Sequence, residues 1–174
     1  APDFKVPYST YLNMILVGTC HGIICLRIYS HSGIHLCNAS TREFLTLPER
    51  PFRCPQGYFS QLCELGFGFD AISNDYKIIT FTTSVPDEYN GDPISCKAEI
   101  YSLSTNSWRE LDPDVTLPEL VYNERFSVSF NGCFHCCTPL NTDCFGLQIL
   151  SFEWSTEQFR EIQYPDRVED TEGE

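Results

Sequence analysis

The chain has 174 residues, of which 42% are apolar and 14% aromatic, so it is long enough to form one domain with a substantial core. Its net charge of −13 argues against a binding surface for nucleic acids or anionic membranes, because such surfaces are basic. The apolar run at residues 14–17 is too short to cross a bilayer. The charge instead favours a basic protein partner, unless it serves solubility alone.

The chain reads as β-strands and turns throughout, and no segment keeps a helical period over about 11 residues. The apolar run at residues 22–26 is typical of a strand. Residues 65–69 and 76–81 form a predicted hairpin in which glycines alternate with phenylalanines, a pattern that lets a ring or another backbone approach closely. A further hairpin is predicted around Asn131-Gly132, which is a strong type I′ turn signal.

One motif occurs three times, with Ser-Thr followed by an aromatic residue four positions after the serine and an aliphatic residue seven positions after it. Each copy predicts a hairpin whose loop has about four residues, because Ser and Thr hydroxyls stabilise such reversals by bonding nearby backbone groups. The separations are 64 residues (from 40 to 104) and 51 residues (from 104 to 155). The three copies begin at Ser40, Ser104 and Ser155, with Phe44, Trp108 and Phe159 as their aromatic residues.

Repeats of this period indicate stacked β units such as propeller blades. The predicted fold class is all-β, a partial kelch-like β-propeller with about three four-stranded blades. Closed propellers have about 4–8 blades, so the natural chain is expected to be longer than this sequence. Such scaffolds bind other molecules more often than they catalyse reactions.

The longest predicted connections are residues 48–63, 85–97 and 112–124, and the second and third are acidic. Long loops on a rigid β scaffold are where recognition tends to occur. The alternative is that these acids are ordinary solvated side chains. The candidate partner-binding residues are Asp87, Glu88, Tyr89, Asp92, Asp112, Asp114 and Glu119.

The ten cysteines are interpreted as mainly reduced core residues, because several lie in apolar strand-like runs and no secretory signal is present. A zinc site at Cys133, His135, Cys136 and Cys137, with Cys144 downstream, is the best metal candidate. It is disfavoured because side chains alternate along a strand, which separates His135 from Cys136, and a second ligand pair is lacking. The simpler interpretation is that Cys133 and Cys137 share one strand face and fill core.

No nucleotide-binding, zinc-protease or nucleophile-elbow motif is found, so we expect no catalytic residues, no cofactor and no metal. A sugar-binding or hydrolytic propeller is the alternative from another functional class. It would need Trp108 and Trp154 in a groove beside paired carboxylates. Both tryptophans are expected in blade cores instead.

Five of these motifs, in this order, resemble the plant F-box-associated domain. They are residues 18–26, residues 38–44 with Leu47-Pro48, residues 65–70 with 75–77, residues 100–103 with Trp108-Arg109, and Asn131-Gly132 with His135. The resemblance implies an F-box-associated domain at 18–166, with a lead-in segment at 1–17 and an acidic tail at 167–174. Residues 54–58 and 151–157 look most like S-locus F-box proteins.

The resemblance implies the substrate-recognition part of a Skp1–cullin–F-box ubiquitin ligase, which is an adaptor and not itself an enzyme. S-locus members act in pollen and recognise basic secreted ribonucleases of the pistil in self-incompatibility, so a basic, S-ribonuclease-like target and a location in the pollen-tube cytoplasm are implied. Skp1 and cullin would be recruited only through the F-box, which this sequence lacks. His21 and Cys136 depart from the family pattern, which often has Asn and Trp there. An F-box protein of another pathway, with a different target, is the alternative within the family.

Overall fold

The computed structural model describes residues 14–28, 33–86, 95–112, 127–139 and 147–163, which contain strands and turns but no helix. The strands form three antiparallel sheets of four strands each. The first sheet contains β1 (Met14–Cys20), β2 (Ile23–Ile28), β3 (Gly33–Asn38) and β4 (Glu43–Thr46). The central sheet contains β5 (Tyr58–Asp70), β6 (Asp75–Pro86), β7 (Ser95–Ser102) and β8 (Ser107–Leu111). The third sheet contains β9 (Ser127–Phe130), β10 (Cys133–Pro139), β11 (Leu147–Glu153) and β12 (Gln158–Gln163).

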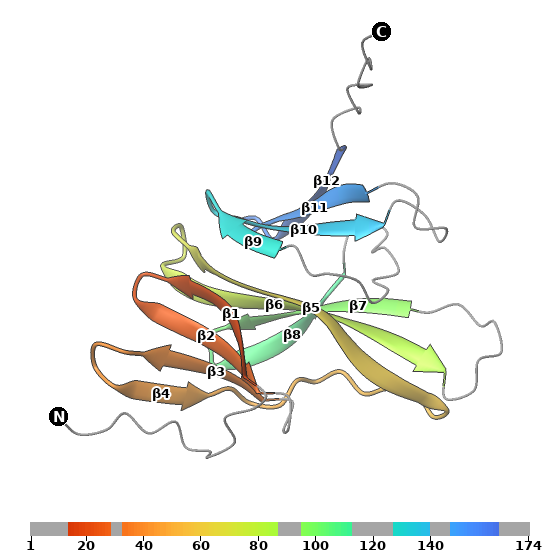
Figure 1. The fold of residues 1–174 in the computed structure, drawn as a ribbon, viewed down its shortest axis with the longest axis horizontal. Helices are drawn as coiled ribbons and strands as arrows, with labels where there is room; N and C mark the ends of the chain where they lie inside the picture. The colour runs from red at the N-terminus through yellow and green to blue at the C-terminus, as the bar shows by residue number, and fades with distance from the viewer. Residues whose placement is uncertain (1–13, 29–32, 87–94, 113–126, 140–146, 164–174) are drawn as a thin grey trace, which may run out of the picture.

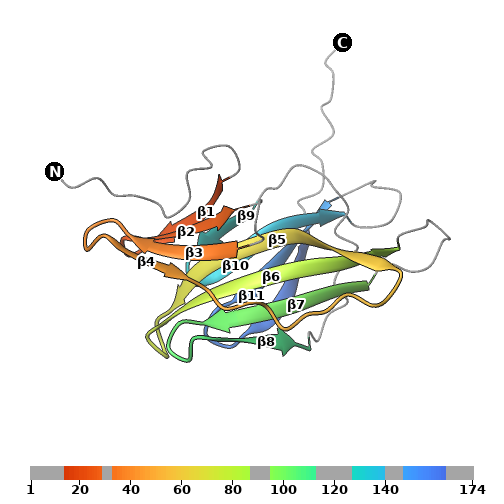
Figure 2. The same cartoon turned by 90° about the horizontal axis from the view of Figure 1, so that it is seen from below.

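Within each sheet the strands follow one another in chain order, so every sheet is an up-and-down meander. The first strands of the sheets lie next to one another, because β5 contacts both β1 and β9. Figures 1 and 2 show the central sheet between the other two. This is the arrangement of successive propeller blades, and it confirms the predicted all-β fold with three four-stranded units.

The three predicted Ser-Thr hairpins are confirmed, and each joins the two outermost strands of its sheet. Their turns span residues 39–42, 103–106 and 154–157, so each has four residues as expected. The last turn residue has a positive φ in every copy. The Asn131-Gly132 turn is also confirmed, with φ of 48° and 74° as a type I′ turn requires.

The central sheet is buried on both faces, because its odd and even positions meet different neighbours. Phe67, Ile78 and Tyr101 pack in one core with residues of the first sheet. Phe81 and Ile100 pack in a second core with residues of the third sheet. A sheet covered on both sides explains why β6 is a nearly continuous apolar and hydroxyl-bearing run without the strict alternation of a half-exposed strand.

Two glycines of β5 allow the third sheet to pack closely against the central sheet in the second core. A Cβ atom on Gly68 would lie 2.2 Å from Nε1 of Trp154, and one on Gly66 would lie 2.4 Å from Cδ2 of Phe134. The rings of the third sheet therefore rest directly on the β5 backbone. This confirms the predicted close approach at the alternating glycines.

Three expectations need correction. The first long connection is shorter than predicted, since β5 begins at Tyr58 and includes residues assigned to the loop. Trp154 is only 1% exposed, as expected, but Trp108 is half-buried at the edge of the first core. Cys133 and Cys137 do share a face of β10, but that face points away from the core, which Phe134 and Cys136 fill. The face of β10 that carries Phe134 and Cys136 is the core face, because the aromatic pairs of the third sheet lie on that side.

The outer faces of the two flanking sheets carry exposed apolar side chains. Phe130 is 64% exposed on the third sheet, and Leu16 is 60% exposed on the first. In the central sheet, the equivalent faces are covered by a neighbouring sheet. Among the described residues, no helix is long and apolar enough to span a membrane.

Candidate protein-binding surfaces

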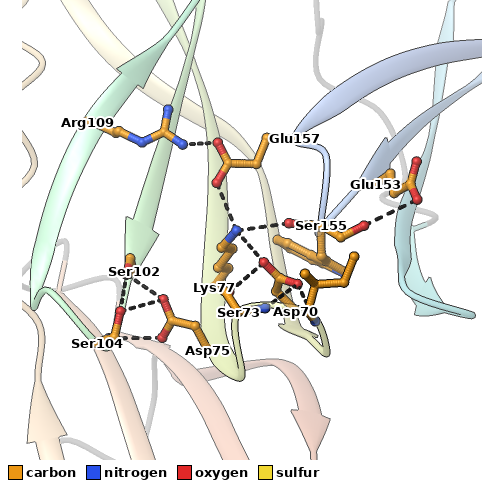
Figure 3. Close-up of polar contacts among 12 residues, drawn as sticks. Asp70, Ser73, Asp75, Lys77, Ser102, Ser104, Arg109, Glu153, Ser155 and Glu157 are labelled. Atoms are coloured by element: carbon orange, nitrogen blue, oxygen red, sulfur yellow. Dashed lines mark hydrogen bonds and ion pairs between the residues drawn. The ribbon is translucent and has the colours of Figure 1, made fainter.

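The tight turns of the central and third sheets meet at a buried charge cluster around Lys77, at the start of β6 (Figure 3). Its Nζ donates to Asp70 Oδ2 at 2.8 Å, to Glu157 Oε1 at 2.9 Å and to the carbonyl of Trp154 at 3.0 Å. Arg109 of β8 adds a second ion pair to Glu157. The cluster thus connects the first hairpin of the central sheet to the Ser-Thr turn of the third.

Asp70 organises the β5–β6 turn while it holds Lys77. Its Oδ1 accepts from the backbone N–H groups of Ile72 and Ser73, as a helix-cap residue would, and Oδ2 accepts from the Ser73 hydroxyl. Burial alone would raise the pKa of this carboxyl, but the hydrogen bonds from Lys77, Ser73 and Ile72 outweigh it. The pKa of Asp70 is therefore held well below its usual range.

Asp75 plays the same role for the second turn of the central sheet. It accepts from the hydroxyls of Ser102 and Ser104 and from the backbone N–H of Ser104 at 2.9 Å. These contacts bind the start of β6 to the Ser-Thr turn after β7 (Figure 3). The acids and the lysine at this end of the sheets bond to one another. The cluster therefore stabilises the turns of the central sheet and joins that sheet to the third.

At the opposite end of the central sheet, residues 48–57 cross the part of its face that the first sheet leaves uncovered. We call these residues the strap. Glu99, which is 1% exposed, anchors it by accepting from Phe52 N at 2.8 Å and Arg50 Nη1 at 3.1 Å. Arg50 also donates to the buried Thr82 hydroxyl at 2.6 Å. The strap is thus fixed by a charge-assisted network and not by apolar packing alone.

A groove of about 470 Å³ separates the strap from the outermost strand of the central sheet, β8. Phe52 and Trp108 line it as half-buried rings, and Trp108 is held in place because its Nε1 donates to the Pro48 carbonyl at 2.9 Å. Arg53 and Lys97 lie at its margin. Two segments far apart in the sequence therefore form the walls of the groove, and hydrogen bonds hold both of them in place.

Of the candidate partner-binding residues, the structure describes only Asp112, which is exposed at the end of β8. An exposed position is what the prediction requires, but it does not test binding. The other six lie outside the described residues, so the structure does not bring the seven together. They are Asp87, Glu88, Tyr89, Asp92, Asp114 and Glu119.

Cys20, Cys25, Cys37, Cys54, Cys133, Cys136 and Cys137 are free thiols, and the described part of the chain contains no group of three or more His, Cys, Asp or Glu side chains placed to hold a metal ion. Burial raises the pKa of the Cys25 and Cys136 thiols, so both stay neutral and act as small apolar side chains. His35 is also buried, bonded to the Thr46 hydroxyl at 3.1 Å and stacked on Phe44. These residues fit structural roles.

Sequence reasoning missed the strap and its anchor. Glu99 lies two positions before the buried Tyr101 on the same strand, and this parity is a signal that it faces inward. No comparable signal joins Glu99 to Arg50, since 49 residues separate them. The sequence indicated Lys77 only as part of the Asp75-Tyr76-Lys77 motif and gave no sign of its ion pairs.

Three four-stranded meanders whose first strands lie side by side are the arrangement of a partial β-propeller. Comparison with known families agrees, because residues 5–171 match the F-box associated beta propeller domain. The chain belongs to this family.

Several proteins of Arabidopsis thaliana are similar to the chain. An F-box protein is 27% identical over 168 residues, covering 92% of this chain and 37% of its own length. F-box protein CPR1 is 24% identical over 165 residues, covering 87% of this chain and 39% of its own length. An F-box/kelch-repeat protein is 32% identical over 163 residues, covering 92% of this chain and 39% of its own length. The chain therefore spans about two fifths of the length of these relatives.

Proposed function

We propose that this chain is the target-binding part of an adaptor that selects proteins for a Skp1–cullin–F-box ubiquitin ligase. The observation that carries the proposal is membership of the F-box associated family together with relatives that are named F-box proteins. In this proposal the chain has no catalytic role and acts in the cytoplasm. Skp1 and cullin would bind an F-box elsewhere in the natural gene product.

The adaptor role is tested by isolating the natural gene product from cells that express it. Skp1 and cullin should co-purify with it, and inhibition of the proteasome should increase the ubiquitinated proteins that co-purify. A product that associates with neither ligase subunit would overturn the proposal. This experiment does not depend on which target is bound.

The finer proposal is that the target is a basic protein of the S-ribonuclease type, as in pollen S-locus F-box proteins. The net charge of −13 supports it, because opposite charges speed encounter and disfavour wrong partners. Asp112 and the six other candidate residues of the two acidic connections are the proposed contacts. An F-box protein of another pathway would share the scaffold and differ in its target.

A salt series with a purified basic ribonuclease tests the charge component. Binding should weaken steeply from low to physiological salt, and reversing Asp112, Asp114 and Glu119 to lysine should weaken it about tenfold or more. Reversing Glu43, Glu49 and Glu161, three exposed carboxylates elsewhere in the described chain, makes the same charge change and is the matched control. Binding that ignores salt, or an equal loss in the control, would contradict these loops as the contact.

The sugar-binding alternative finds no support in the described residues. Trp154 is buried against Gly68 and cannot stack on a ligand. Trp108 does line a groove, but Trp154 does not share it.

A further inference from the structure

We propose that the outer face of the third sheet packs against a fourth four-stranded unit of the same repeat, supplied by the natural gene product outside these 174 residues, and that this unit rests on side chains instead of bare backbone. The inference concerns the fold and does not depend on the ligase role. We call this surface the open face. It carries Val128, Phe130, Cys133, Cys137, Ile149 and Ile162.

The first argument is the aliphatic residue of the repeated Ser-Thr hairpin, seven positions after the serine. Leu47 and Leu111, from the first two copies, are each 7% exposed. Leu47 lies in the core between the first and central sheets, and Leu111 lies in the core between the central and third sheets. In both copies this residue therefore packs towards the sheet that follows. The equivalent Ile162 is 44% exposed and has no such sheet in the described part of the chain.

A second repeat position, six residues before the serine, shows the same difference. Ile34 and Ala98 occupy it in the first two copies, and both are buried in the same two cores. Ile149 occupies it in the third copy and is only partly buried. It pairs with Ile162 on one side and with Cys137 on the other. The positions that bury the next sheet elsewhere thus form one continuous row on the open face.

The kind of partner follows from continuity with the two interfaces already present. In each of them the neighbour is a four-stranded sheet, and it contributes aromatic rings such as Phe67 or Phe134 to the shared core. On the open face, Val128 and Phe130 are both more than half exposed, which is typical of a surface that has a partner. A stack of repeated units leaves such a face at its end until another unit covers it.

The innermost strand of the third sheet predicts a different kind of packing from that at the central sheet. The glycines of β5 admit the rings of Phe134 and Trp154 directly onto its backbone. The corresponding strand, β9, contains no glycine and presents Val128 and Phe130 to the open face. The fourth unit therefore contacts these two side chains and lies farther from the strand backbone than the third sheet lies from β5.

Thiol reactivity in the purified natural gene product tests whether the open face is covered, because Cys133 and Cys137 lie on it. Both are partly exposed in the structure, and so is Cys54 of the strap. We expect iodoacetamide to alkylate Cys133 and Cys137 at least tenfold more slowly than Cys54, with each rate divided by that of the same cysteine in the denatured protein. Mass spectrometry of digests gives the rates. Reaction of Cys133 and Cys137 as fast as that of Cys54 would overturn the proposal.

Dilution distinguishes a unit of the same polypeptide from a second copy. Protection by the same polypeptide should be unchanged after a dilution of about a hundredfold, because no association is involved. Protection that disappears on dilution would assign the open face to an interface between copies and would overturn the proposal.

A substitution locates the contact. In the natural gene product, Phe130→Lys should lower the midpoint of thermal unfolding by about 4 °C or more, because it places a charge in a covered apolar surface. The milder Ile162→Thr should give a smaller shift in the same direction. Ile72→Lys, at a residue that is 83% exposed in the β5–β6 turn, is the control and should shift the midpoint by less than about 1 °C. Shifts on the open face no larger than the control would show that nothing packs there.

Discussion

The two faces of the central sheet are covered in different ways. Towards the third sheet, aromatic rings rest on the backbone of glycines, and a buried lysine closes the end of the interface. Towards the first sheet, contact is looser at Gly18 of β1, because a Cβ there would lie 3.9 Å from the nearest atom, Cβ of Phe67. The strap completes that face through polar bonds. One interface is therefore closely packed ring on backbone, while the other is completed by the strap with a groove beside it.

The largest expected effect comes from the two tryptophans. Trp154→Ala should lower the free energy of unfolding by about 3–5 kcal/mol, because it empties the core against Gly68. Trp108→Ala should cost about 1–2 kcal/mol, since that ring is half-buried. Urea unfolding measures both. Equal losses would remove the distinction between the interfaces.

Breaking the charge cluster should have the next largest effect. Lys77→Met leaves Asp70 and Glu157 without their shared cation in a buried place and should cost about 3 kcal/mol. Lys97→Met, at the exposed pair with Glu110, is the matched control and should cost under about 1 kcal/mol. If chemical denaturation shows the two variants to be alike, the cluster does not stabilise the interface.

A Gly→Ala substitution at each interface compares directly how closely the two interfaces are packed. Gly68→Ala should cost about 1–3 kcal/mol, because the new Cβ would overlap the Trp154 ring. Gly18→Ala should change stability by less than about 0.5 kcal/mol. Thermal unfolding of both variants gives the measurement. The cost at Gly68 should shrink in a Trp154→Phe background, and a cost that stays the same would argue against the ring contact.

Acid should weaken the cluster through Asp70. Because its folded pKa is depressed, Asp70 adds stability above the pKa of an unfolded aspartate, about 3.9, and this is lost as the pH falls towards the folded value. The free energy of unfolding of the original chain should therefore exceed that of Asp70→Asn by about 1–2 kcal/mol at neutral pH. This difference should close below about pH 4. Denaturation at a series of pH values measures it. As a control, replacing the exposed Asp112 by Asn should produce no such difference in stability. A difference at Asp70 that does not change with pH would contradict this account.

The smallest global effect is expected at the strap. Glu99→Gln keeps an acceptor for Phe52 N–H but removes the charge that pairs with Arg50, so it should cost about 1 kcal/mol. Hydrogen exchange should quicken at Phe52 and its neighbours while the β11 amides keep their protection. Glu110→Gln, on the exposed edge, is the control. Uniform quickening across the chain would mean that Glu99 supports the whole fold and not the strap.

The hairpins were predictable from sequence because a turn is a local event. Ser-Thr and Asn-Gly act on backbone groups within a few residues, so three motif copies and one type I′ signal were enough to place eight strands in pairs. The length of β5 was not predictable in this way. Residues 58–63 contain polar side chains and run into a bulge between Leu62 and Glu64, and they become strand only because β6 pairs with this segment.

The candidate site was less accessible to sequence reasoning. The acidic connections were found by composition, and of their chosen residues the structure describes Asp112 alone. The groove depends on Arg50, Glu99 and Trp108, which lie far apart in the sequence and meet only after the strap folds across the central sheet. No periodicity connects them.

The sequence by itself determined that the chain forms repeated β-hairpins and that glycines of one strand would be approached closely, because turn chemistry and the absence of a Cβ are properties of single residues. Only the tertiary structure decided which rings fill those places, which acids are buried as anchors and where a groove forms beside the strap. Those outcomes depend on side chains from different sheets sharing one space, and the free energy of burying a ring or a charge is set by its neighbours.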